Sequence, residues 1–322
     1  MRLEHQILAA FGLDLLLGDP RWLPHPVKLI GRCAAALEAP LRKAIPCEYL
    51  AGGVAWALIA GASGGAAWGL VAGAGCLSPV AGDVAAVLLL YTAFAARDLL
   101  DHSRNVLQAL RAGDLPEARR RVGWIVGRDT ANLDEAGVVR AAVESVAEST
   151  VDGVTAPLFF AVVGGPVGAL VYKAINTLDS MFGHKDARYL KFGRVSARVD
   201  DAANFLPARL TAPLVAIAAA LLRYRPVAAL RVLARDGRKH PSPNAGLAEA
   251  AVAGALNVQL GGLNFYAGEP HQGALIGDPH EPLQGEHIAR ANALMLLTAL
   301  LALCLFIGLR VLVLALWRGG AG

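Results

Sequence analysis

Long apolar stretches alternate with polar segments along the whole chain. Charge is absent or nearly absent from five runs, which cover residues 51–75, 80–96, 153–175, 205–222 and 291–317. Most of these runs approach the ~20 residues that an α-helix needs to cross a bilayer. An earlier stretch, Ile7 to Leu17, is interrupted by Asp14 and is too short to span alone. The pattern predicts an all-α integral membrane protein with four to six membrane-embedded helical segments.

Polar segments lie between these runs, at residues 18–50, 97–152, 176–204 and 223–290. The second of them reads as mostly helical. The others read as long loops, with a small-residue helix at roughly Leu247 to Gln259 in the last. Ionisable side chains that adjoin apolar segments are candidates for function, because charge at membrane depth is costly. We therefore expect residues 1–322 to form a single membrane-embedded domain whose polar segments carry the site.

The run 153–175 has a weak point at its centre, Gly164-Gly165-Pro166. Proline removes a helical hydrogen bond and clashes with the preceding turn, and glycine weakens a helix further. One alternative is a kinked spanning helix, and the other is a re-entrant hairpin of two short helices. The hairpin is favoured, and it would return Asn176 to the membrane side on which Asp152 lies.

Composition supports a membrane protein and excludes several other classes. The 322 residues are 55% hydrophobic and 17% charged, against roughly 25% charged residues in soluble domains. A net charge of +4 is too small to indicate nucleic-acid binding. The four cysteines include no C-x-x-C pair, so neither a disulfide framework nor a zinc site is expected. Glu4 and Asp14 argue against a signal peptide.

A proline-rich stretch follows the first apolar residues. Gly18 to Arg32 contains three prolines within seven residues, which predicts a rigid loop that carries Asp19 and His25. Gly-Asp-Pro is also ordinary turn chemistry, and basic residues here could simply lie on lipid headgroups. The two interpretations are about equally supported by the residues alone.

Three carboxylates precede the broken apolar run. Glu144, Glu148 and Asp152 are four residues apart, so on a continuous α-helix they would stack along one face and repel one another. A cation would relieve that repulsion, and magnesium takes carboxylate and phosphate oxygens. The competing interpretation is a solvated acidic face. No G-x-x-x-x-G-K-[ST] loop and no G-x-G-x-x-G motif is present, so a bound phosphate would need scattered Arg and Lys.

Several blocks together resemble a known family. They are LDLLLGDPRWLPHPVKLIGR, GRDTANLDEAGVVRAAVESVAESTVDGVTAPLFF, YKAINTLDSMFGHK, DDAANFLPARLTA and HPSPNAG. In this order, over nearly the whole chain, they are similar to the integral-membrane adenosylcobinamide-phosphate synthase family of the CbiB and CobD type. Ser149 departs from the family pattern, which usually has Asn there, and this argues against an essential role for the position.

The resemblance implies an amide-forming step late in cobalamin (vitamin B12) synthesis. The family joins adenosylcobyric acid to an aminoalcohol phosphate, typically (R)-1-aminopropan-2-ol O-phosphate, and consumes ATP with magnesium. The expected route forms an acyl phosphate from ATP, which the neutral amine then attacks. The implied cofactors are thus ATP and Mg²⁺, and the product is adenosylcobinamide phosphate.

Roles follow from the resemblance as hypotheses. Magnesium and ATP phosphates are assigned to Glu144, Glu148 and Asp152, with Asp179, Asp200 and Asp201 as alternates or a second metal-ligand set. Phosphate contacts are assigned to Arg128, Lys185, Arg194 and Arg209. His25 or His184 is the candidate acceptor of the amine's proton, because histidine titrates near neutral pH. Asp129 is a further catalytic candidate, and Asp19 and Asn244 are further cofactor-binding candidates.

The expected location is the inner (cytoplasmic) membrane, as a multi-pass protein with its site on the cytoplasmic side. The expected partners are the two substrates and the lipid bilayer, without nucleic acid. A homo-oligomer or an assembly with other cobalamin-synthesis enzymes stays open. Two other classes compete with the ligase: a membrane transporter or channel for a small solute, and a non-catalytic scaffold for corrinoid enzymes.

Overall fold

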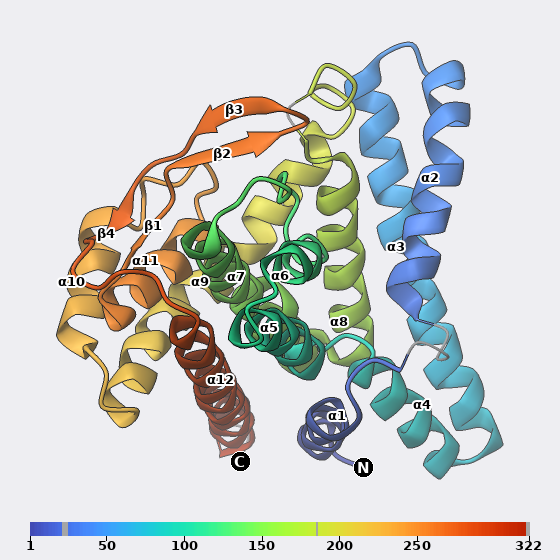
Figure 1. Ribbon diagram of the computed structural model, residues 1–322. Helices are drawn as coiled ribbons and strands as arrows, with labels where there is room; N and C mark the ends of the chain where they lie inside the picture. The colour runs from blue at the N-terminus through green and yellow to red at the C-terminus, as the bar shows by residue number, and fades with distance from the viewer. Residues whose placement is uncertain (21–24, 185, 320–322) are drawn as a thin grey trace. The chain divides into compact units, whose positions relative to one another are not determined.

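The computed structural model describes residues 1–20, 25–184 and 186–319, and most of them are helical (Figure 1). The helices are α1 (Leu3–Leu17), α2 (Pro26–Ala44), α3 (Glu48–Leu77), α4 (Pro79–Tyr91), α5 (Ala96–Arg111), α6 (Leu115–Val122), α7 (Glu135–Ser149), the π-helix η1 (Thr150–Thr155), α8 (Ala156–Phe182), α9 (Arg194–Leu221), α10 (Pro226–Asp236), α11 (Ala245–Leu256) and α12 (Glu286–Gly319). Four short strands lie between α11 and α12: β1 (Gln259–Leu260), β2 (Leu263–Tyr266), β3 (Glu269–Gln272) and β4 (Ile276–Gly277).

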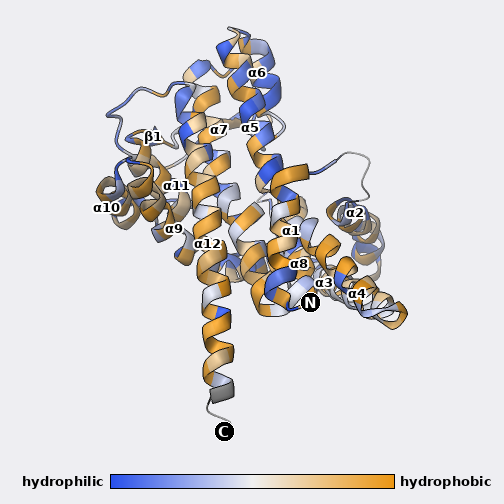
Figure 2. Cartoon of the chain, turned by 90° about the horizontal axis from the view of Figure 1, so that it is seen from below, coloured by the Kyte–Doolittle hydropathy of each residue, from blue (hydrophilic) through white to orange (hydrophobic). Residues whose placement is uncertain are grey.

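Membrane-length helices are the dominant feature of this architecture. Within the described residues, five helical stretches are long and apolar enough to cross a bilayer: Glu48–Leu77, Pro79–Arg111, Glu135–Phe182, Arg194–Leu221 and Glu286–Trp317. Figure 2 shows hydrophobic residues along most of α12 and hydrophilic residues gathered on α6. The predicted all-α integral membrane fold is confirmed.

The chain divides into two compact units. The first contains Met1–Ala95, Ala156–Asn204 and Leu305–Gly322, and the second contains Ala96–Thr155 and Phe205–Cys304. Helices α9 and α12 are continuous, and each is divided between the two units: one part belongs to the first unit and the rest to the second. The single membrane-embedded domain stays a prediction, and each unit has a hydrophobic interior and a polar cluster of its own.

Small and aromatic side chains form the core of the first unit, between α2, α3 and α8. The buried members are Ile30, Ala34, Ala51, Ala55, Ile59, Ala174, Leu178, Phe182 and Phe192. A Cβ added at Gly52 would lie 1.8 Å from the carbonyl oxygen of Phe192. Only glycine allows this close approach, as is typical where backbones meet inside a membrane.

The apolar run 153–175 folds back on itself within α8. Gly165 has φ 60° and ψ −151°, a conformation essentially reserved for glycine, and Pro166 follows it. The rings of Phe160 and Tyr172 stack with centroids 5.0 Å apart, whereas a straight α-helix would separate them by about 18 Å. The predicted hairpin is therefore confirmed over a kinked spanning helix, and its partial insertion into a bilayer stays a prediction.

Arg310 of α12 binds at the break in α8. Because Pro166 has no backbone N–H, the carbonyl of Val162, four residues earlier, lacks its helical donor. Arg310 donates Nη1–H to that carbonyl at 2.9 Å and Nε–H to Glu4 at 3.0 Å. Arg310 thus connects the end of α12 with α1 and with the α8 hairpin.

The N-terminal polar segment is more helical than its prolines indicate. Helix α2 begins at Pro26, and His25 caps it by accepting the backbone N–H of Val27 at Nδ1, 3.2 Å away. Proline suits the first helical turn because an N–H there has no helical acceptor. The predicted rigid loop over Gly18–Arg32 is therefore wrong from Pro26 onward, and residues 21–24 lie outside the described residues.

Helices also occupy parts of the other two predicted loops. In the segment 176–204, α8 continues to Phe182 and α9 begins at Arg194. In the segment 223–290, α10 buries Ala229 and Val232 on one face while its arginines face outward. Amphipathic helices of this kind contain many polar residues and therefore read as loops when charge alone is counted.

Two small antiparallel sheets lie in the second unit. Strand β1 pairs with β4, and β2 pairs with β3 through Asn264 opposite His271. The entry to β2 needs Gly261 and Gly262, which have φ 80° and φ 86°. Strands of two to four residues are too short to show the alternation of apolar and polar residues that identifies a strand in a sequence. No strand was predicted here.

The π-helix η1 changes the direction of side chains after Ser149. A π-helix bonds residue i to i+5, so its side chains do not keep the four-residue stacking of an α-helix. Asp152 lies in η1 and is half-buried, whereas Glu148 on α7 is exposed. The prediction that Glu144, Glu148 and Asp152 form one continuous α-helical face is therefore wrong at Asp152.

Candidate functional site

Glu144 is the carboxylate around which polar groups of the second unit gather. Its Oε2 accepts a hydrogen bond from Arg128, and its Oε1 accepts the backbone N–H of Gly261 at 2.6 Å. The side chains of Arg128 and Glu144 are only 7% and 12% exposed, so water screens this ion pair little. The Arg128 guanidinium thus supplies a positive charge that relieves the repulsion expected between the carboxylates of α7.

Arg140, which the sequence analysis missed, binds the β2–β3 hairpin to α7. Its guanidinium donates to the carbonyl of Gly261, to the carbonyl of Leu263 at 2.8 Å and to Asn264 Oδ1 at 2.9 Å. Arg128 donates to the same Asn264 oxygen. Two guanidinium groups therefore converge beside Glu144. On the sequence, Arg140 looks like an ordinary residue of a polar helix face, so no local signal identifies it.

Asp129 contacts the same hairpin. Its backbone N–H donates to the carbonyl of Phe265 at 2.8 Å, and its Oδ2 accepts the backbone N–H of Gly268 at 2.7 Å. These contacts hold the turn between β2 and β3. They suit a positioning role, and a direct catalytic role for Asp129 stays a prediction.

The HPSPNAG block forms the turn that leads into α11. Asn244 is buried, and its Oδ1 accepts a hydrogen bond from Arg209 at 3.1 Å. The Arg209 guanidinium also lies over the Phe205 ring, 3.4 Å from its centroid. Two residues predicted separately as cofactor contacts, Arg209 and Asn244, are therefore brought together. His240 begins the block, and its Nε2 lies 4.0 Å from Glu249 Oε1.

Glu249 is a second acid that the sequence analysis missed. It lies in α11, where every residue except Leu247 is buried. Burial raises the pKa of its carboxyl well above the usual range, and the nearby charges of Glu148 and Glu144 raise it further, against the opposing charge of Arg128. A signal was present in the sequence, because a lone ionisable residue inside an apolar helix is a candidate for function.

Asp200 is the central acid of the polar cluster in the first unit. It lies on α9 and is buried, and Asn204 donates to its Oδ2 at 3.0 Å. Asn204 in turn accepts a hydrogen bond from the Tyr172 hydroxyl at 2.9 Å. Asp200 Oδ1 is buried without a hydrogen-bond partner among the described residues. An unsatisfied carboxylate oxygen of this kind requires an explanation, such as a bound ion.

Asp179 and Asp201 are the charged neighbours of Asp200, and the Asn176 side chain lies close enough to interact with the Asp200 carboxyl as a hydrogen-bond donor. A Cβ at Gly183 would lie 2.0 Å from Asp179 Oδ1, so glycine leaves the space that this carboxylate occupies. The structure therefore gathers the three aspartates that were predicted as an alternate metal-ligand set.

The remaining candidates of the first unit lie in local contacts. His25 Nε2 lies 3.6 Å from Asp19 Oδ2, while its Nδ1 caps α2. His184 is exposed and contacts the Tyr189 ring, with 6.3 Å between ring centroids.

Of the two basic residues predicted as phosphate contacts nearby, Arg194 is described by the structure. Arg194 lies over the Tyr49 ring, 5.7 Å from its centroid, which explains its orientation without a phosphate. Lys185 lies outside the described residues.

A hard cation fits the aspartates better than the acids of α7. Within the described residues, no group of three or more His, Cys, Asp or Glu could hold a metal ion by itself. Magnesium, however, commonly takes one or two carboxylates and completes its shell with water and substrate phosphates. Asp200 offers an unpartnered oxygen with acids beside it, whereas both oxygens of Glu144 already accept hydrogen bonds.

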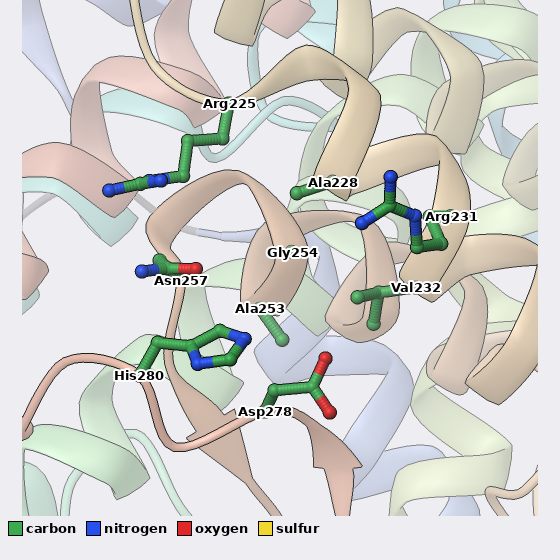
Figure 3. A pocket seen from close by; sticks show the side chains of 9 residues that line it. All are labelled: Arg225, Ala228, Arg231, Val232, Ala253, Gly254, Asn257, Asp278 and His280. Carbon is green, nitrogen blue, oxygen red and sulfur yellow. The ribbon is translucent and has the colours of Figure 1, made fainter.

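A cavity of about 430 Å³ lies apart from these predicted residues, within the second unit (Figure 3). Figure 3 shows the His280 ring directed toward its centre and the Arg225 side chain extended to one side. Asp278 pairs with Arg235 at 3.0 Å, and Arg225 lies 3.5 Å from Glu281. Two of the charged residues that line the cavity are therefore engaged in ion pairs at its edge.

Similarity to known proteins identifies the family. A family model described as CobD/Cbib protein matches residues 7–295. The chain belongs to the CobD/CbiB family. The cobalamin biosynthesis protein CobD of Geobacter metallireducens is 54% identical over 277 residues, which cover 86% of this chain and 87% of that protein. No solved structure matches the chain.

Two further relatives extend over more of the chain. The cobalamin biosynthesis protein CobD of Leptospira interrogans (strain Fiocruz L1-130) is 47% identical over 295 residues, 92% of this chain and 94% of that protein. The cobalamin biosynthesis protein CbiB of Salmonella choleraesuis is 46% identical over 304 residues, 94% and 95% of the two chains. CobD/CbiB membership gives the protein a role in cobalamin biosynthesis and confirms the family that the sequence blocks resemble.

Proposed function

We propose that the protein catalyses ATP-dependent amide formation between adenosylcobyric acid and an aminoalcohol phosphate, with (R)-1-aminopropan-2-ol O-phosphate as the expected amine. The observation that carries this proposal is family membership over residues 7–295. The polar clusters of both units support it, because they arise from the same sequence blocks that resemble the synthase family.

The chemistry requires activation of a carboxylate, which is a poor electrophile. Transfer of the γ-phosphoryl group of ATP to the corrinoid carboxylate would give an acyl phosphate and ADP. The amine nitrogen then forms a bond to the carbonyl carbon, the bond from that carbon to the phosphate oxygen breaks, and inorganic phosphate leaves. Each amide therefore consumes one ATP.

The aspartates of the first unit are the proposed magnesium ligands. Asp200 would supply its buried Oδ1, and Asp179 or Asp201 a second oxygen. When bound, magnesium neutralises charge on transferring phosphates. Asn204 would hold Asp200 in place through its hydrogen bond to Oδ2, and the Tyr172 hydroxyl would orient Asn204 through a second hydrogen bond.

The second unit supplies a guanidinium group for anionic substrates. Arg209 is fixed by Asn244 and by the Phe205 ring, so its orientation is set before a ligand binds. Arg128 and Arg140 are already bonded to Glu144 and to the β2–β3 hairpin, so Arg209 is the guanidinium proposed to contact phosphate. Guanidinium groups bind phosphate oxygens in a planar, two-bond geometry, and preorganisation reduces the entropy lost on binding.

The proposed setting is the inner membrane, with the site open to the cytoplasm. ATP and the corrinoid substrate are available on that side. The long apolar helices would keep the protein in the bilayer. Several acids of the polar clusters lie on these same helical stretches: Glu144 and Asp179 on Glu135–Phe182, and Asp200 on Arg194–Leu221. A homo-oligomer or an assembly with other cobalamin-synthesis enzymes is compatible with this arrangement.

Reconstitution tests the proposal. The purified protein in liposomes is supplied with adenosylcobyric acid, the aminoalcohol phosphate, ATP and magnesium, and the corrinoid product is identified by mass spectrometry. We expect product only when all four components are present, and its loss when magnesium is chelated. Solute flux without amide product would favour a transporter, and substrate binding without turnover would favour a scaffold.

A further inference from the structure

Glu249 is a buried acid whose carboxylate is not satisfied by protein donors. Its side chain lies in α11 and the residue is only 6% exposed. Among the described residues no group donates a hydrogen bond to it, and the nearest ionisable partner is His240, 4.0 Å away. A largely buried carboxylate without protein hydrogen bonds is costly, so a proton, water or a cation has to stabilise it.

The charges that face Glu249 do not supply this cation. Helix α7 contributes Glu144 and Glu148, which are both acidic, and the preceding loop contributes Arg128. Arg128 is already committed to Glu144 and to Asn264. A small cationic ligand is therefore the group that would balance the acids at Glu249.

His240 is the partly exposed neighbour of Glu249. The backbone N–H of Ser242 donates to His240 Nδ1 at 3.0 Å, so a neutral ring carries its proton on Nε2, the nitrogen that faces Glu249. The His240 side chain is 31% exposed. A Cβ at Gly246 would lie 2.5 Å from His240 Cβ, so glycine at this position allows the histidine to approach α11.

We propose that Glu249 binds the ammonium group of the aminoalcohol phosphate, accepts its proton during amide formation and releases that proton to solvent when the product leaves. The proposal rests on the proposed function. The ammonium group has no lone pair and cannot attack until it loses one proton, which Glu249 takes. The nitrogen then bonds to the activated carbonyl carbon, and its second proton departs with the phosphate that leaves.

The first test measures recognition without turnover. Calorimetric titration of the protein with (R)-1-aminopropan-2-ol O-phosphate should show binding at least about tenfold weaker for Glu249→Gln, because a neutral amide replaces the charge that faces the ammonium group. The control, Glu269→Gln, changes an exposed acid on β3 and should bind as the wild type does. Unchanged binding by Glu249→Gln would overturn the assignment, whether or not coupling occurs.

The second test separates proton transfer from a structural role. At pH 7 we expect Glu249→Gln to couple the amine about 100-fold more slowly. An alkoxyamine analogue, already neutral at this pH, should reduce that loss to less than tenfold. Between pH 7 and 9 the variant's rate should rise about tenfold per unit, with the fraction of free amine, while the wild-type rate rises less steeply.

The controls make each outcome decisive. Glu249→Asp keeps the carboxylate and should recover part of the rate, and it replaces Glu249→Gln if that variant does not assemble. Proton transfer to Glu249 would be contradicted if Glu249→Gln slowed coupling equally for the amine and the alkoxyamine. The rate of the variant would then also depend on pH as the wild-type rate does. If the wild-type protein binds the amine but forms no amide, the coupling function fails while ammonium recognition by Glu249 stands.

Discussion

At the residue scale, the proposed chemistry rests on two buried acids. Asp200 has one oxygen without a hydrogen bond beside two other aspartates, and Glu249 has no hydrogen bond among the described residues and faces the acids of α7. Glu144, in contrast, is neutralised by Arg128. The first two acids are suited to bind a cation, and the third is suited to hold an arginine in place.

Asp200→Asn should remove most of the coupling activity. The amide keeps the shape of the side chain but loses the charge that would hold magnesium, so we expect the rate to fall about 100-fold and half-maximal activity to need more magnesium. Rates measured against magnesium concentration test this expectation, with the exposed Glu48→Gln as the control. An unchanged rate and magnesium dependence in Asp200→Asn would exclude it as a ligand.

Asp236 should make the second unit sensitive to acid. Its carboxylate accepts hydrogen bonds from Arg235 and from the Gly277 N–H, and Lys239 lies 2.6 Å from it. Its pKa is lowered, first by Arg235 and then by Lys239 and the Gly277 N–H, against burial. A lowered pKa stabilises the fold above the unfolded pKa of about 4, and this stability is lost as the pH falls through the lower folded value.

Thermal unfolding in detergent from pH 3 to 7 measures this effect. Asp236→Asn should destabilise the protein by about 1–2 kcal/mol at pH 7, and the difference from wild type should shrink below pH 4. Asp278→Asn, which removes only an exposed partner of Arg235, should cost less than about 1 kcal/mol. A difference that stays constant over the pH range would rule out the carboxylate charge as its cause.

At the element scale, the α8 hairpin depends on particular glycines. Gly165 has a conformation that other residues rarely adopt, and a Cβ at Gly168 would lie 2.5 Å from the Phe160 carbonyl oxygen. Gly164 has open space around it. We expect Gly165→Ala and Gly168→Ala each to destabilise the protein by about 1–3 kcal/mol, and Gly164→Ala to have little effect.

Thermal unfolding of the three alanine variants in detergent compares them directly. If all three lose the same stability, the cost comes from the general loss of glycine in the membrane segment. The fold-back at Gly165 and Pro166 would then not be the element that sets the stability of α8.

Elements that bury apolar surface along their length were predictable from the sequence. The runs at 51–75 and 291–317 became helices, and the Gly-Gly-Pro centre correctly favoured a hairpin. Helix α2, the π-helix η1 and the β2–β3 hairpin were missed. Their formation depends on caps, close packing and contacts with Arg140, which a count of charge and apolar residues does not contain.

At the scale of the whole molecule, the predicted site residues divide between the two units. Asp179, Asp200 and Asp201 gather in the first, and Arg209 meets Asn244 in the second. The family blocks identified most of these residues, but not their partners. Arg140 contacts a hairpin that is distant in sequence, so only the folded chain reveals it. Glu249 had a sequence signal, its place in an apolar helix, but the acids that face it become visible only in the folded chain.

Cysteine labelling tests whether both clusters serve the same side of the membrane. In a variant whose four native cysteines are replaced, Ser180→Cys reports on the first unit and Ser242→Cys on the second. A shared cytoplasmic substrate supply predicts that an impermeant thiol reagent labels both positions from the cytoplasmic face. Labelling from opposite faces would reject a common cytoplasmic site.

The central claim is that ATP activates the corrinoid carboxylate for attack by an amine. Adenosylcobyric acid labelled with ¹⁸O in the reacting carboxylate tests this claim most directly, because an acyl phosphate transfers one carboxylate oxygen to the phosphate that leaves. The account predicts one ¹⁸O atom in inorganic phosphate for each amide formed. Amide formation with no ¹⁸O in the released phosphate would contradict it.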